Sequence, residues 1–271
     1  MQFTTQNEII EIHLTDGRTI SGQRGSTAEA FLNILAGENQ PLIVGAVING
    51  ELHELTRPIN MESKVQPITM ADSDGSRIYR RSLTFLLEAA FANLYPEVSL
   101  YIDHSVSSGG YYCHIIGRNT LSSDDLKLVE SEMRRLVSLD LPLIRKEASL
   151  EEAISLFENQ KAEDKVRLMR YRSKSYVTLY SLDNHVDYHH GYMVPSTRYL
   201  RWFGLVSSNG GFTLRFPRRH APALIEPMED YPQLMNAFRL YGNWLEKLGI
   251  ESVGALDDAI RSGRSLSLIH I

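Results

Sequence analysis

The chain is poor in cysteine. Cys113 is the one cysteine among 271 residues. A single thiol cannot form an internal disulfide, and it cannot supply the several thiolates of a cysteine-rich zinc site. The composition fits a reducing compartment, so we expect a cytoplasmic protein.

Long apolar runs and a positive net charge are also missing. No stretch approaches the roughly eighteen apolar residues of a membrane span, and the N-terminus lacks the basic and apolar regions of a signal peptide. We therefore predict no contact with a membrane. The chain has 28 Lys and Arg against 33 Asp and Glu, a net charge of −5. This balance argues against a surface coated for nucleic acid, although local basic patches remain open.

The residues that are present predict an α+β fold. The first segment alternates apolar and polar residues around the turn Asp16-Gly17, and a helix capped by Ser26 or Thr27 follows before further strands. This pattern indicates a small β-grasp domain over residues 1–70. Strands and helices then interleave without a regular βαβ repeat, which favours α+β over a doubly wound sheet. We predict a larger α+β domain over 71–225 and a helical linker over 226–271.

The helix predicted over residues 80–96 raises the question of a site. Arg81 and Phe85 lie four positions apart and share one face of this helix. Arg81 is a permanent cation that suits a phosphate or a carboxylate. In the alternative, Phe85 packs in the core and Arg81 caps a surface.

Three further segments carry candidate chemistry. The stretch "DYHHGYMVPSTRY" places His189, His190 and Arg198 among aromatic side chains, which suits stacking and charged hydrogen bonds or forms a self-satisfied polar loop. "GGYYCHI", with Tyr112, is a glycine loop over a ligand or a plain hairpin turn. The basic segments 165–176 and 214–220 indicate a phosphate-binding face or ordinary solvated surface.

The order of these motifs resembles a known family. Residues 9–69 resemble a TGS domain, and the segment after them is similar to the second additional domain of threonyl-tRNA synthetases. Where that family has Arg-His-Ser-x-x-His-Leu-Leu, this chain has "RRSLTFLL". "GGYYCHI" stands for its Gly-Phe-Tyr-Tyr-Asp, and "GYMVPST" stands for its Gly-Pro-His-Val-Pro-x-Thr. The likeness covers residues 9–218.

The departures from the family pattern bear on chemistry. The four family positions that hold water or metal for ester hydrolysis correspond to Arg81, Phe85, His189 and Met193. One imidazole cannot build a zinc site, which needs three or four ligands. The resemblance therefore implies a degenerate editing cavity with no metal and no catalytic residue. We expect it to bind a phosphorylated small molecule or nucleotide through five side chains: Arg81, Tyr112, His189, His190 and Arg198.

A second resemblance concerns the C-terminal part. A TGS domain and editing-like domain followed by "FRLYGNWLEKLGIESVGALDDAI" resemble the N-terminal half of bacterial uridine-kinase-like nucleoside kinases, of the phosphoribulokinase/uridine kinase family. The chain contains no Gly-x-x-x-x-Gly-Lys-Ser/Thr loop. The resemblance implies a noncatalytic ligand-binding or regulatory half, without a cofactor of its own. The resemblance also leads us to expect, in cis beyond residue 271, a kinase domain that uses ATP and magnesium. Residues 266–271 coincide with a reading frame of a common sequencing adapter, so we expect that the kinase domain is missing because the sequence is truncated.

Two alternatives stay open. One is a degenerate editing hydrolase that clears mischarged tRNA, with Arg81 orienting the substrate and His189 or His190 as general base. The other is a binding module for tRNA or other RNA, whose affinity would fall steeply with salt.

Overall fold

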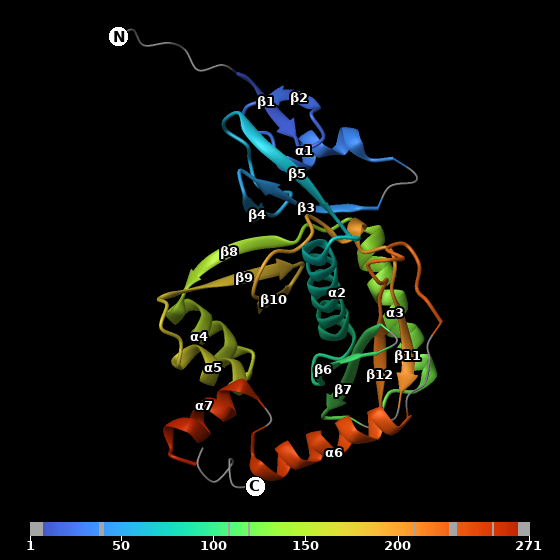
Figure 1. Cartoon of the computed structure of the whole chain (residues 1–271). Coiled ribbons are helices and arrows are strands. Elements are labelled where there is room, and N and C mark those ends of the chain that lie inside the picture. Colours follow the sequence, from blue (N-terminus) through green and yellow to red (C-terminus); the bar gives the residue numbers. More distant parts are fainter. Residues whose placement is uncertain are drawn as a thin grey trace. The chain divides into compact units, whose positions relative to one another are not determined.

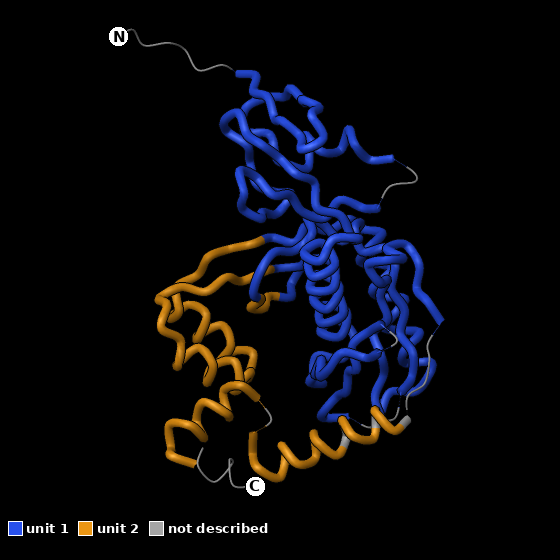
Figure 2. Tube along the Cα trace, viewed as in Figure 1, with its two compact units in different colours: residues 1–144, 181–185, 190–228 blue, residues 145–180, 186–189, 229–271 orange. Residues whose placement is uncertain are grey.

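The computed structural model describes residues 8–37, 41–107, 109–118, 120–208, 210–227, 232–250 and 252–264. The chain divides into two compact units (Figure 2). Unit 1 comprises residues 1–144, 181–185 and 190–228, and unit 2 comprises residues 145–180, 186–189 and 229–271. Helices and three sheets are interleaved along the chain, which confirms the α+β fold class (Figure 1). The boundary predicted after residue 70 lies inside unit 1, and the predicted domain limits stay predictions.

Unit 1 begins with a five-stranded mixed sheet and one short helix. Its elements are β1 (Ile9–Leu14), β2 (Thr19–Gln23), α1 (Ala28–Leu32), the 3-10 turn η1 (Asn33–Leu35), β3 (Ile43–Ile48), β4 (Glu51–His53) and β5 (Ser63–Thr69). The strand order is β2-β1-β5-β3-β4, and β1 runs parallel to β5 at the centre. Ile12 and Val65 are fully buried on these central strands. This is the β-grasp arrangement that the sequence pattern predicts.

Helix α2 (Ser73–Leu94) is longer than the predicted helix. The predicted start at residue 80 is wrong, because the helix already begins at Ser73 and includes Asp74, Gly75 and Ser76. Gly75 lies in the first turn, where an added Cβ would come within 1.9 Å of the carbonyl oxygen of Thr69. Asp72 accepts a hydrogen bond from the amide of Thr69 at 2.7 Å. The glycine therefore permits close packing of α2 against the end of β5, and it does not break the helix.

A four-stranded antiparallel sheet completes unit 1. Its strands are β6 (Ser99–Val106), β7 (Gly110–Ile116), β11 (Gly204–Ser208) and β12 (Gly211–Arg215), in the order β11-β12-β7-β6. Helix α3 (Ser123–Ser138) begins with a capping box between Ser122 and Asp125. The Phe91 ring of α2 stacks on Phe212 of β12, with centroids 5.8 Å apart. Cys113 is buried on β7, and burial raises the pKa of its thiol to about 12. It is therefore an unreactive core residue near neutral pH.

The described residues of unit 2 form most of a three-stranded sheet and four helices. The strands are β8 (Ile144–Ser149), β9 (Tyr176–Leu182) and β10 (His185–Tyr188), in the order β10-β9-β8. The helices are α4 (Leu150–Asn159), α5 (Glu163–Arg170), α6 (Pro232–Leu248) and α7 (Val253–Arg261). Phe157 and Met169, both fully buried, anchor the core between α4, α5 and β9. None of the helices in the described ranges combines the length and hydrophobicity of a membrane span. Residues 266–271 lie outside the described part.

Candidate functional site

The start of α2 and the segment 190–199 meet within unit 1. Arg81 Nη1 donates a hydrogen bond to the carbonyl oxygen of Tyr192 at 2.6 Å. The amide of Val194 donates to the Ser82 hydroxyl at 2.9 Å, and that hydroxyl donates to the Ile78 carbonyl at 2.8 Å. The consecutive helix residues Arg81 and Ser82 thus bind residues that lie 111 and 112 positions further along the chain. These are two of the segments that the family resemblance predicts to face one cavity, and the cavity itself stays a prediction.

Gly191 lets Arg81 approach the backbone of the segment. Its φ is +91°, and an added Cβ would lie 2.9 Å from the guanidinium carbon of Arg81. A side chain at this position would therefore meet both a strained backbone and a steric contact. The Arg81 guanidinium is part-buried here, and at least one of its donors is used by the protein itself.

The rest of the segment is also held by buried polar contacts. Thr197 is fully buried, and its hydroxyl donates to the Leu136 carbonyl at 2.7 Å and accepts from the Leu141 amide at 2.9 Å. The Met193 amide donates to Glu54 Oε1 at 3.1 Å. Glu54 is 139 positions away from Met193, and no sequence signal singles it out.

Arg198 and the neighbouring Tyr199 bind the same carboxylate. Arg198 Nη2 lies 2.7 Å from Glu29 Oε1, and the Tyr199 hydroxyl donates to the same oxygen at 2.5 Å. Burial, with the nearby Glu29 carboxylate, raises the pKa of Tyr199. Arg198 was predicted as a ligand-binding residue, and in the structure its guanidinium forms an ion pair that links the segment to α1.

Two of the degenerate hydrolytic positions are apolar and buried. Phe85 is 0 % exposed and Met193 is 1 % exposed. The Phe85 ring lies against His185, with centroids 5.1 Å apart, and His185 Nε2 lies 3.8 Å from Glu88 Oε2. Neither Phe85 nor Met193 offers a nitrogen or oxygen ligand for Zn²⁺ or a hydrogen bond to an attacking water.

The remaining predicted residues occupy three different surroundings. Tyr112, on β7, stacks on His104 with centroids 5.2 Å apart, and desolvation by burial raises the pKa of its phenol. His190 is exposed and precedes Gly191 in unit 1. His189 belongs to unit 2, whereas Arg81, Phe85 and Met193 belong to unit 1. The four family positions are thus divided between the two units.

Comparison with known proteins gives one consistent relationship. The threonine–tRNA ligase of Thermotoga petrophila is 33% identical over 205 residues, which are 75% of this chain and 31% of that protein. The enzyme of Lawsonia intracellularis is 31% identical over 210 residues, 76% of this chain and 31% of the enzyme. The enzyme of Staphylococcus aureus is 30% identical over 206 residues, 76% of this chain and 32% of the enzyme. No family model matches the chain.

These relatives support the resemblance to the TGS and editing-like region of threonyl-tRNA synthetases. The chain spans about a third of the length of the curated relatives it matches. None of these three relatives is a nucleoside kinase, so the kinase parent, its ATP and its magnesium gain no support and stay predictions.

Proposed function

We propose that this chain is a tRNA-binding module that does not hydrolyse the aminoacyl ester. The observation that carries the proposal is the similarity to threonine–tRNA ligases over three quarters of the chain, combined with the replaced side chains at Arg81, Phe85 and Met193. Such relatives act on tRNA, as their names state, and an inherited RNA-binding surface can outlast the loss of a catalytic group.

The geometry at α2 supports the loss of hydrolysis. A guanidinium stays protonated in proteins, so Arg81 cannot accept a proton from water. Its Nη1 donor is used on the Tyr192 carbonyl, and Phe85 and Met193 are closed off in the core. A general base such as His189 or His190 accelerates a reaction only when the attacking water is also positioned. The side chains that would position it are absent from the matching positions.

Both basic segments keep cations without a carboxylate partner, which supports contact with phosphate. In the basic segment of unit 2, Lys165 pairs with Asp187, Arg167 with Asp258 and Arg170 with Glu158. Arg172 and Lys174 of the same segment have no carboxylate partner in the part of the chain that the structure describes. In the basic segment 214–220 of unit 1, Arg219 is exposed and has no carboxylate partner within the described ranges. A guanidinium that is not paired internally is available to a phosphate oxygen.

The test is a pair of assays on the purified chain. Binding of full-length tRNA is measured at low and at physiological salt, with a single-stranded DNA of equal length as control. We expect tRNA binding that weakens steeply with salt, because phosphate contacts release counterions. Incubation with seryl- or threonyl-tRNA should release no amino acid above the buffer rate.

Two outcomes contradict the proposal in different ways. Absence of tRNA binding at low salt removes the RNA-binding function. Ester hydrolysis that His189→Ala or His190→Ala abolishes replaces it with the editing-hydrolase alternative.

A further inference from the structure

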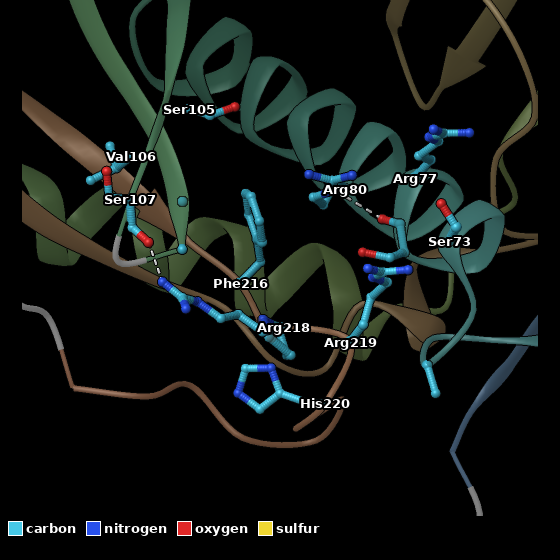
Figure 3. Close-up of a pocket in the computed structure, with 15 residues that line it drawn as sticks. Ser73, Arg77, Arg80, Ser105, Val106, Ser107, Phe216, Arg218, Arg219 and His220 are labelled. Atoms are coloured by element: carbon cyan, nitrogen blue, oxygen red, sulfur yellow. Dashed lines mark hydrogen bonds between the residues drawn. The ribbon is translucent and has the colours of Figure 1, made fainter.

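A basic cavity lies in unit 1 at the start of α2, and Arg81 is not among its lining residues. Its volume is about 720 Å³, within the range of small-molecule sites. It is bounded by the first turns of α2, the end of the β6–β7 hairpin and the segment that follows β12 (Figure 3). Its basic lining residues are Arg77, Arg80, Arg218, Arg219 and His220, and no carboxylate is among its lining residues. We call this feature the basic cavity.

The charges around the basic cavity are only partly balanced. Arg77 pairs with Asp74 at 3.1 Å, and Arg218 lies 3.4 Å from Glu226, which also contacts His220 at 2.7 Å. Arg80 and Arg219 form no ion pair with a carboxylate in the part of the chain that the structure describes. Two permanent positive charges therefore remain for a ligand.

The basic groups are held in place by the fold. Arg80 Nε donates to the Ser76 carbonyl at 3.1 Å, and its guanidinium lies 5.7 Å from the centre of the Phe216 ring. Arg218 Nη2 donates to the Ser107 carbonyl, as the dashed line in Figure 3 shows. Gly109 has a φ of +88°, and an added Cβ would lie 3.1 Å from Arg218 Nε. The hairpin end thus requires a residue without a side chain beside this arginine.

The other lining groups favour a phosphate and a sugar over a base. Ser73, Ser76, Ser105 and Ser107 contribute to the lining, and serine hydroxyls both donate and accept hydrogen bonds. Phe216 is 6 % exposed and is covered by Arg80, so its ring is not a free platform for stacking. The start of α2 adds the partial positive charge of a helix N-terminus to the same region.

We propose that the basic cavity binds a phosphate monoester on a sugar, the group carried by the 5′ end of an RNA strand and by a free nucleotide. A phosphate monoester carries about −1.5 to −2 charge at pH 7, which matches the two unpaired guanidinium groups. An internal phosphodiester carries a single negative charge, so it would balance only one of the two guanidinium groups. The RNA source rests on the proposed function, whereas the nucleotide source does not.

The experiment separates the two sources and the two proposals. Calorimetric titration of the full chain compares AMP with adenosine, and a binding assay compares tRNA with a 5′-phosphate to the same tRNA after phosphatase treatment. The variants are Arg219→Gln, Arg80→Gln/Arg219→Gln and, as control, Arg57→Gln, an exposed arginine that does not line the cavity. Thermal melting checks that each variant is folded, and the exposed Arg219 position keeps the test valid if the double variant unfolds.

We expect a preference for the phosphorylated ligand from at least one source. Loss of one guanidinium–phosphate hydrogen bond should weaken that ligand about ten- to a hundredfold in Arg219→Gln, and more in the double variant. Arg57→Gln should bind as the unmodified chain does. The cavity substitutions should change the affinity for adenosine and for dephosphorylated tRNA by a smaller factor.

Three outcomes overturn or separate the ideas. If AMP binds no better than adenosine and tRNA binding ignores its 5′-phosphate, the cavity proposal is wrong, although tRNA binding itself stands. If the cavity substitutions leave a phosphate preference unchanged, the site lies elsewhere and the proposal is again wrong. If AMP binding depends on Arg219 but no tRNA binds, the cavity proposal holds and the proposed function fails.

Discussion

Arg80 and Arg81 are neighbours in sequence but serve two different faces of α2. Successive helical residues point about 100° apart, and the two arginines have different neighbours in the structure. Arg81 donates to the Tyr192 carbonyl beside the buried Phe85 and Met193, whereas Arg80 lines the open basic cavity with Arg77.

The contrast between the two faces shows how a surface changes when its catalytic ligands are replaced. The face that matches the family's hydrolytic positions is closed by a backbone hydrogen bond and two apolar side chains. The basic cavity beside it, to which Arg80 and Gly109 of the family-like motifs also contribute, keeps two guanidinium groups that pair with no carboxylate in the described part of the chain. A binding role on this chain is therefore better sought at Arg80 than at Arg81.

The largest expected effect tests whether the Arg81 face is part of the core. Phe85→Ala should lower the free energy of unfolding by about 3–5 kcal/mol, because it removes a fully buried ring and leaves a cavity. Urea unfolding followed by circular dichroism measures this change. Phe85→Leu is the control and should cost less than about 1.5 kcal/mol, since it keeps most of the apolar volume. A loss below about 1 kcal/mol for Phe85→Ala would show that this face is loosely packed.

The second effect separates the two arginines by stability. Arg81→Ala should lower the free energy of unfolding by about 1.5–3 kcal/mol, the range for hydrogen bonds to charged groups. Arg80→Ala should cost less, about 0.5–1.5 kcal/mol, because its hydrogen bond goes to the Ser76 carbonyl of the same helix and its guanidinium lies over Phe216 beside an open cavity. The same unfolding assay compares both. Equal effects at the two positions would break the contrast between the faces.

The third and smallest effect concerns the glycine that admits Arg81. Gly191→Ala should cost about 1 kcal/mol from its positive φ alone, plus the displacement of the Arg81 guanidinium. In an Arg81→Ala background only the backbone cost should remain. A double-mutant cycle on unfolding free energies measures the difference. A coupling energy of zero would mean that Arg81 does not press on Gly191.

The sequence also left parts of the site unpredicted, for identifiable reasons. The family pattern led to Arg81 and to the segment around Met193, and the structure joins these two segments within unit 1. It offered no reason to choose Glu54 or Glu29, because their partners are 139 and 169 positions away. Arg218, Arg219 and His220 belong to a predicted basic segment, but Arg77 and Arg80 were not linked to it. Which of two adjacent helical arginines reaches that segment depends on the rotation of α2.

The sequence by itself determined most of the secondary-structure elements and the absence of the family's hydrolytic side chains. Alternating apolar residues, turn glycines and helix caps such as Thr27 and Ser122 act locally, so they can be interpreted without knowing what packs against them. The sequence likewise shows directly that Phe85 and Met193 replace side chains able to bind a metal or a water. Only the tertiary structure decided that Gly75 lies inside a helix, that Arg81 is used on a backbone carbonyl and that Arg80 and Arg219 line one cavity. Those outcomes depend on contacts between residues distant in sequence, which local propensities do not encode.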